Sequence, residues 1–273
     1  LAKGITDPTK PWEHKDAAAL DFISMKSFIE TMSNTSQLAK KFLMHYFATY
    51  NATPIEQQSL LGMLAVIAAG GYEKYWTETD TLRCIGGAQQ VAEKLADVIG
   101  RERIQLLSIV SSVIEHETGV TVTLQNGEEY HADEVVITVP PTVLQAMQIS
   151  PPPPKQQSVM GTTMKQIAIT PSKQWDPKGP NLISDDVVTW HGTANQGGEG
   201  PHALVILESN EAAEVLRQQI ADGTRNISPD VEIAYPELTP SESIVIDWKK
   251  DQHARGSYSF PPLGYITSQR QVA

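Results

Sequence analysis

The sequence predicts a mixed α+β protein in which helices come first and strands dominate the later part. Three observations favour this class. Helical periodicity runs through residues 1–80, apolar and polar residues alternate up to Asn126-Gly127, and strand-like apolar runs recur after residue 160. Those runs are Gln166–Thr170, Val187–Trp190, Ala203–Leu207 and Ile244–Trp248, with one more helix expected over Glu211–Ala221.

The helical region carries a recognisable start and stop signal. Thr53 precedes Pro54, and Glu56 lies three positions after Thr53, which is the pattern of a capping box with proline at the first helical position. Gly70-Gly71 would end the helix that follows. We therefore expect a helix to begin at this capping box.

Two apolar stripes at helical spacing predict faces that pack into a core. One stripe belongs to the helix before Gly70-Gly71, and the other to an earlier helix over residues 36–50. The stripes are Leu60, Leu61, Leu64 and Ile67, and Leu38, Phe42, Leu43 and Tyr46.

The middle of the chain, residues 84–141, predicts a helix, a hairpin and a buried strand. The helix over Val91–Ile99 would turn Val91, Leu95 and Val98 towards a sheet and end at Gly100. Asn126-Gly127 is a strong hairpin signal. The β-branched run Val135–Val139 predicts a strand covered on both faces. Prolines at 151–154 indicate a rigid crossover between substructures.

Composition excludes several classes of partner and site. The formal net charge of −11 argues against nucleic acid and anionic membrane surfaces. The single cysteine, Cys84, allows no internal disulfide and favours a reducing compartment such as the cytoplasm. The longest apolar run, Leu60–Ala69, is too short to span a bilayer, and no signal peptide is recognised. Seven scattered histidines form no metal pattern.

The order of several segments resembles the flavin monoamine oxidase family of FAD-dependent amine oxidases. The matching segments are TDPTKPWEHKDAAALD, GGAQQVAEKLADVIG, ITVPPTVLQAMQISPPPP, MGTTMKQIAI and DWKKDQHARGSYSFPPLG. The resemblance implies a substrate domain of helices and sheet that is interleaved with part of an FAD-binding domain. It assigns residues 1–80 to the helical part of the substrate domain, 81–142 to a partial FAD-binding domain, 143–247 to the sheet part of the substrate domain, and 248–273 to a truncated return towards the FAD domain.

Two motifs of that family are missing from the sequence. No G-x-G-x-x-G follows a strand, and the glycine clusters at Gly86-Gly87 and 197–200 have a different spacing. The C-terminal segment that closes over the flavin is also missing, and Cys84 does not match the family's flavin-linking cysteine. Because the chain also begins at Leu1 rather than Met, we expect a fragment that binds FAD weakly or not at all without the missing halves of the FAD domain.

The resemblance implies roles for four residues. Lys165 matches the family lysine that holds a water near the flavin N5, where an ammonium would favour charge developing on the reduced flavin or on oxygen. Val110, in a register that could slip to Ile109, matches the position that meets the adenine. Trp248 matches an aromatic beside the flavin. Tyr258 matches one wall of the aromatic cage through which the amine approaches.

The expected activity of the parent protein is oxidation of a primary or secondary amine to an imine, with molecular oxygen reduced to hydrogen peroxide. Two alternatives stay open. The chain could be a non-catalytic binding module that keeps the substrate-domain fold, or the parent could be an L-amino acid or polyamine oxidase of the same fold. The amino-acid version needs an arginine that binds the substrate carboxylate, and the sequence singles none out, since Arg83, Arg217 and Arg255 are all plausible surface residues.

Overall fold

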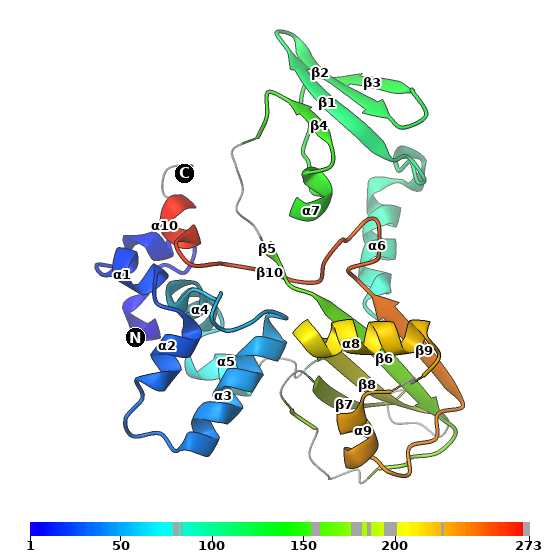
Figure 1. Cartoon of the computed structure of the whole chain (residues 1–273). Helices are drawn as coiled ribbons and strands as arrows, with labels where there is room; N and C mark the ends of the chain where they lie inside the picture. The colour runs from blue at the N-terminus through cyan, green and yellow to red at the C-terminus, as the bar shows by residue number, and fades with distance from the viewer. Residues whose placement is uncertain are drawn as a thin grey trace. The chain divides into compact units, whose positions relative to one another are not determined.

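The computed structural model describes residues 1–78, 82, 84–153, 159–175, 182–184, 187–193, 201–224 and 227–269 (Figure 1). The chain divides into two compact units. Unit 1 comprises Leu1–Ala69 and Gln157–Ala273, and unit 2 comprises Gly70–Gln156. Helices dominate the first part and strands the second, which confirms the predicted α+β class.

Unit 1 begins with short helices that pack around one apolar helix, α4. The helical elements are η1 (Ala2–Gly4), η2 (Pro11–Glu13), α1 (Ala17–Asp21), α2 (Met25–Glu30), α3 (Gln37–Tyr50) and α4 (Leu60–Ala69), with α10 (Tyr265–Gln269) near the end of the chain. Asp21 links three of them. Its buried carboxylate accepts hydrogen bonds from Ser59 Oγ at 2.6 Å and from the backbone N and Oγ1 of Thr267, each at 2.8 Å. These charge-assisted bonds hold α10 beside α1.

The predicted capping box does not start a helix. The helix begins at Leu60 instead, and the Oγ of Ser59 accepts a hydrogen bond from the backbone N of Gly62 at 3.2 Å. Two tertiary contacts replace the box: Glu56 accepts from Lys26 Nζ at 2.8 Å, and the Thr53 carbonyl accepts from the side chain of Gln58 at 2.9 Å. Tertiary partners therefore outweigh the local capping preference at this position.

The helix expected over residues 36–50 is confirmed as α3, with Ser36 Oγ accepting from the backbone N of Ala39 at 3.1 Å. Its predicted core stripe is wrong, because Leu38 is 79% exposed and Phe42 is 49% exposed. The helix instead buries Phe47 and Thr49. By contrast, Leu60, Leu61 and Leu64 of the second stripe are buried as predicted.

A four-stranded antiparallel sheet forms the second part of unit 1, in the order β7-β8-β6-β9. All the predicted strand runs and the predicted helix fall on elements of this part. The elements are β6 (Thr163–Thr170), β7 (Val187–Thr193), β8 (His202–Ser209), α8 (Asn210–Ala221), α9 (Pro229–Ala234) and β9 (Glu242–Asp247). A two-stranded pair, β5 (Val159–Met160) with β10 (Ser259–Phe260), precedes and follows them in the chain.

Helices α8 and α9 cover one face of this sheet (Figure 1). Alternate residues of a strand point to opposite faces. The even-numbered residues Met164 and Ala168 of β6 pack with residues of α8 and α9, respectively. The odd-numbered residues Lys165, Ile167 and Ile169 are only half-buried, so they line the second face of the sheet.

Unit 2 is built on a four-stranded sheet of order β3-β2-β1-β4, with β1 and β4 parallel and the other pairs antiparallel. Its elements are α5 (Glu73–Thr77), α6 (Gln89–Ile99), η3 (Arg101–Arg103), β1 (Val110–His116), β2 (Gly119–Leu124), β3 (Glu129–Ala132), α7 (Pro141–Leu144) and β4 (Gln148–Ser150). The hairpin at Asn126-Gly127 is confirmed, and Gly127 has the positive φ, 87°, that its turn requires.

Two expectations for unit 2 are wrong. Residues 135–139 form no strand, and Val136 is 86% exposed. Helix α6 ends before Gly100 as predicted, but no residue of α6 is buried, and Val98 is 85% exposed. Both segments have the apolar pattern of a buried element but stay largely exposed among the described residues, because burial of a strand or helix requires a partner surface.

Candidate functional site

Lys165 stands on the sheet face that α8 and α9 leave open. Its register partners are Leu207 of β8 and Ile246 of β9, so its cross-strand neighbours on that face are apolar. Directly opposite residues of an antiparallel pair share one face. Within the part of the chain that the structure describes, Lys165 Nζ has no hydrogen-bond or ion-pair partner. The structure therefore presents one ammonium group between two apolar cross-strand neighbours.

Trp248 follows directly after the strand that pairs with β6. The last residue of β9, Asp247, is the register partner of Met164, so the backbone of Trp248 lies beside the segment that carries Lys165. The Trp248 side chain is half-buried. The loop after it closes through a hydrogen bond from the backbone N of Gly256 to the Trp248 carbonyl at 3.0 Å, which brings Tyr258 back to the same region.

Gly161 joins the Tyr258 segment to the start of β6. Its backbone N donates to the Tyr258 carbonyl at 2.7 Å, and its carbonyl accepts from the backbone N of Ser257 at 2.9 Å. A Cβ at position 161 would lie 2.6 Å from the carbonyl oxygens of both Asn51 and Ala52. Only glycine allows this close backbone approach. The chain thereby brings the Lys165, Trp248 and Tyr258 segments together within unit 1.

Val110 belongs to unit 2, whereas the other three predicted site residues belong to unit 1. It is the first residue of β1, is half-buried and pairs with Leu124, and the register shifts between Val110 and Ser112. Ile109, the other register considered, is 41% exposed, and its carbonyl accepts from the backbone N of Gln125 at 2.8 Å. The structure places Val110 at the start of β1 in the sheet of unit 2.

The two units differ in how well they fit an FAD cofactor. In unit 1, an unpartnered lysine on an apolar face fits the polar edge of a flavin ring. In unit 2, Gly86 and Gly87 have positive φ values of 80° and 94° just before α6, but no described strand leads into them. A pyrophosphate cradle needs a strand, a glycine turn and a helix in succession. The described residues of unit 2 therefore contain no such phosphate cradle; residues 197–200 lie outside the described part.

Tyr258 adjoins an apolar cavity of unit 1. The two residues after it, Ser259 and Phe260, line a cavity of about 400 Å³. Its walls also include Trp12, Val66, Pro261 and Tyr265. Tyr258 itself is 43% exposed and so is available to a ligand from the solvent side.

Arg217 of unit 1 already forms an ion pair with Asp247, so it is not available to a substrate carboxylate. Arg217 Nε and Nη2 donate to the two carboxylate oxygens of Asp247 at 2.5 and 2.9 Å. Burial raises the pKa of Asp247, but the hydrogen bonds and charge of Arg217 outweigh burial and hold that pKa below its usual value. Arg255 is exposed and donates to the Gln252 carbonyl, and Arg83 lies outside the described residues. No described arginine is thus seen to form a carboxylate clamp.

A second ionisable group lies beneath the sheet. Glu208 is 1% exposed, and neither carboxylate oxygen has a hydrogen-bond partner. Burial, with a contribution from the charge of Asp230, raises the pKa of Glu208 to about 8. It occupies an even-numbered position of β8, on the face opposite Lys165.

Among the described residues, no group of three or more metal-ligating side chains could hold an ion, and no described helix has the length and apolar character needed to cross a membrane. Sequence reasoning missed Gly161, although it lies inside the quoted MGTTMKQIAI segment. It also missed Glu208, which reads as an ordinary strand-end residue. Both residues are recognised only from the three-dimensional structure. Gly161 lies against two backbone carbonyls, and Glu208 is completely buried.

Comparisons with known proteins find relatives that match nearly the whole chain. Among curated proteins, the chain is 24% identical over 280 residues to the probable flavin-containing monoamine oxidase A of Dictyostelium discoideum, covering 96% of this chain and 60% of that protein. It is 25% identical over 280 residues to the putrescine oxidase of Kocuria rosea, covering 92% and 58%.

Solved structures show the same fold. A putrescine oxidase redesigned in its cofactor binding matches with a TM-score of 0.81 at 23% identity, covering 98% of this chain and 63% of the other. Cyclohexylamine oxidase from Brevibacterium oxydans matches with a TM-score of 0.72 at 20% identity, covering 97% and 62%. The chain thus spans about 60% of the length of these relatives.

The family model described as flavin containing amine oxidoreductase matches residues 9–272, which is nearly the whole chain. The chain therefore belongs to the flavin-containing amine oxidoreductase family.

Proposed function

We propose that this chain is the substrate-binding part, together with a portion of the cofactor domain, of an FAD-dependent amine oxidase. The observation that carries the proposal is the position of Lys165 on an open apolar sheet face, with the Trp248 and Tyr258 segments tied to the same region through Gly161. In the whole protein, residues outside this chain complete the phosphate cradle.

FAD, when bound, would supply the redox chemistry for oxidation of the amine to an imine, with oxygen reduced to hydrogen peroxide. The chain's own residues orient the reactants. Trp248 would pack beside the flavin ring, and Val110 would contact the adenine from unit 2. The exposed ring of Tyr258 offers an aromatic face to the amine, which attracts its cationic form and flanks its neutral form.

Lys165 would act through its charge. The apolar neighbours Leu207 and Ile246 exclude water from around the ammonium and lower the local dielectric constant, which strengthens its interaction with any negative charge that develops nearby. A lysine on this face therefore suits a reaction in which reducing equivalents reach oxygen. The ammonium would also hold a water against the reacting centre.

The amino-acid alternative is less well supported, because the pairing of Arg217 with Asp247 removes it as a substrate clamp. The relatives named putrescine oxidase and cyclohexylamine oxidase support amine oxidation in general. A non-catalytic module would not need an unpartnered ammonium at the centre of an apolar face, so we favour the enzyme.

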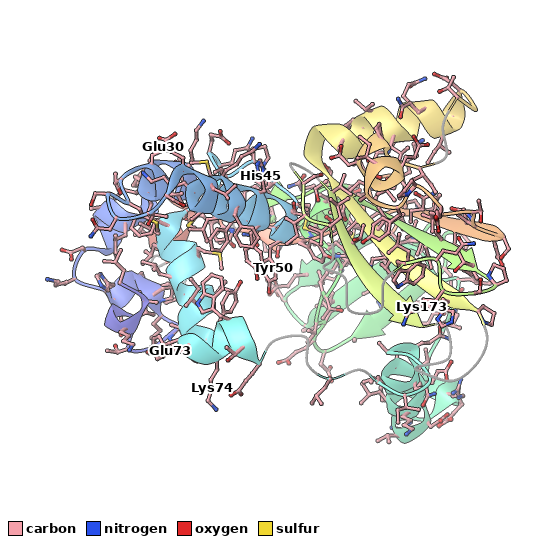
Figure 2. The ribbon with its side chains drawn as sticks, turned by 90° about the horizontal axis from the view of Figure 1, so that it is seen from below. Glu30, His45, Tyr50, Glu73, Lys74 and Lys173 are labelled. Carbon is pink, nitrogen blue, oxygen red and sulfur yellow. The ribbon has the colours of Figure 1, made fainter. Side chains whose placement is uncertain are left out.

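The test uses the whole protein with Lys165→Met and, as a matched control, Lys173→Met. Lys173 is an exposed lysine three residues after β6 (Figure 2). We expect reoxidation of the reduced flavin by oxygen to slow on the order of a hundredfold for Lys165→Met and to stay unchanged for Lys173→Met. An undiminished reoxidation rate in Lys165→Met would show that the role assigned to Lys165 is wrong.

A further inference from the structure

Two buried hydroxyl groups face each other next to Lys165. Thr163, the first residue of β6, is the register partner of Ser209, the last residue of β8. Both residues are fully buried, and neither Thr163 Oγ1 nor Ser209 Oγ has a hydrogen-bond partner. Buried hydroxyls in folded proteins are normally satisfied, often by an internal water molecule. Both hydroxyl groups of this pair therefore remain able to form further hydrogen bonds.

The spacing of the pair suits a single bridging water. Side chains directly opposite in an antiparallel pair have Cβ atoms about 4.5–5.5 Å apart. Thr163 and Ser209 do not bond to each other, and a water between them can reach both oxygens at ordinary distances of about 2.8 Å. An internal water usually makes about three hydrogen bonds, so such a water needs a further partner.

The end of α3 closes this corner of the sheet. Helix α3 packs against β8, and the backbone N of Thr162 donates to the Ala52 carbonyl, just after the helix, at 3.0 Å. Figure 2 shows Tyr50, the last residue of α3, at the end of the helix that approaches the sheet. Thr49, in the same last turn, is 2% exposed and has an unpartnered Oγ1. Unsatisfied hydroxyls thus lie on both sides of the junction between α3 and the sheet.

Lys165 lies within reach of the hydroxyl pair. Residues i and i+2 of a strand line one face, so Thr163 and Lys165 share a face and are about 7 Å apart along β6. The four-carbon stem of lysine can span that distance. The ammonium carries three donors and has no acceptor among the described residues, whereas the hydroxyls and a water have free lone pairs.

We propose that Thr163 and Ser209 hold an internal water that accepts a hydrogen bond from Lys165 Nζ, so that the hydroxyl pair positions the Lys165 ammonium on the apolar face. Thr163 and Ser209 are thereby positioning residues for the site described above. The proposal deepens the proposed function, but its test needs no flavin and so can fail independently of it.

The test compares three single substitutions in the flavin-free chain. Thr163→Val keeps the shape of the side chain and removes the hydroxyl, and Thr163→Ser keeps the hydroxyl. Thr170→Val is the matched control, since Thr170 is also fully buried on β6 with an unpartnered Oγ1 but lies on the opposite face from Lys165. The readout is the rate of reductive methylation of Lys165 by formaldehyde and cyanoborohydride, followed by peptide mass spectrometry.

We expect Thr163→Val to raise the methylation rate of Lys165 by about threefold or more, because the ammonium loses its anchor. Thr163→Ser and Thr170→Val should leave the rate within about twofold of the original chain. An unchanged rate in Thr163→Val, or an equal rise in Thr170→Val, would overturn the proposal. If Thr163→Val does not fold, Ser209→Ala replaces it with the same expectation.

The melting temperature of Thr163→Val gives a second, independent test of whether a water bridges the pair. If a water bridges the pair, Thr163→Val removes one of its partners and the melting temperature falls by about 3 °C. If the hydroxyls are simply unsatisfied in a dry corner, the valine relieves that cost and the melting temperature rises. A rise would contradict the proposal.

Discussion

Unit 1 has an extensive apolar core, although Leu38 and Phe42 of α3 are exposed, whereas unit 2 leaves its most regular apolar patterns exposed. In unit 1, Leu204 and Ile206 of β8 are fully buried under α9. In unit 2, the apolar stripe of α6 includes Leu95, which is 57% exposed, and Val98, which is 85% exposed. The described residues of unit 2 that are both apolar and buried are Tyr75, Val113, Val120 and Leu124.

The difference shows that sequence pattern and burial are separate properties. The pattern of α6 is that of a helix packed on a sheet, and residues 135–139 have the β-branched run of a central strand. Neither has a partner surface in the described chain. Unit 1, by contrast, completes its own core and brings together the Lys165, Trp248 and Tyr258 segments. Among the described residues, unit 1 thus has an extensive core of its own, and unit 2 has a small one.

The titration of Glu208 tests whether the interior of unit 1 excludes water. It is expected to change the free energy of unfolding more than any other test proposed below. The carboxyl ionises near 4.5 in the unfolded chain and, because of burial and Asp230, near pKa 8 in the folded one. Between these values the unfolded state holds fewer protons, so the free energy of unfolding falls as pH rises and levels off above about pH 8. The total loss could reach about 5 kcal/mol.

Urea midpoints measured from pH 5 to pH 9 check this prediction. Glu208→Gln removes the titrating group, so its midpoint should vary much less with pH than that of the original chain. Parallel curves for the two proteins would mean that Glu208 is not buried as the structure has it.

A matched pair of leucines compares the two units directly. Leu204→Ala should destabilise unit 1 by about 2–5 kcal/mol, since it leaves a cavity in a packed core. Leu95→Ala changes an exposed helix position, and leucine and alanine have similar helix propensities, so its effect should stay below about 0.5 kcal/mol. Urea unfolding of both variants provides the measurement. Equal losses would break the distinction between the units.

Two arginines, one in each unit, compare a shielded ion pair with an exposed one, and their expected effects on stability are smaller. Arg217 forms a bidentate pair with Asp247, and the two side chains are 10% and 14% exposed. Arg217→Ala should cost about 2 kcal/mol, because it strands a shielded carboxylate. Arg101 pairs with Asp97 in unit 2, where both side chains are more than 60% exposed, so Arg101→Ala should have no measurable effect on thermal stability. A loss in Arg101→Ala as large as that in Arg217→Ala would refute the difference.

Elements with a local signal could be predicted from the sequence. The strands and the helix after residue 160 and the Asn126-Gly127 hairpin needed only periodicity and turn chemistry. The prediction of a capping box at Thr53 was wrong because Gln58 donates a hydrogen bond to the Thr53 carbonyl and Lys26 donates one to the Glu56 carboxylate. The prediction of a strand over residues 135–139 was wrong. A run of β-branched residues favours an extended backbone but does not specify a neighbouring strand with which it can pair.

The candidate site was predictable only in part. Family resemblance singled out Lys165, Trp248 and Tyr258, and the structure brings their segments together, while their roles remain proposals. The pairing of Thr163 with Ser209 joins residues far apart in the sequence and depends on the register of two strands. Hydroxyl residues are common in strands, so no sequence pattern marks this pair.

The central proposal is that the flavin site is incomplete in this chain, since the described residues contain no phosphate cradle. The most direct measurement adds FAD to the purified chain, removes free FAD by desalting and records flavin absorbance. The account predicts that essentially no flavin stays bound to the chain, whereas the whole protein keeps it. Stoichiometric retention of FAD by the chain alone would contradict the account.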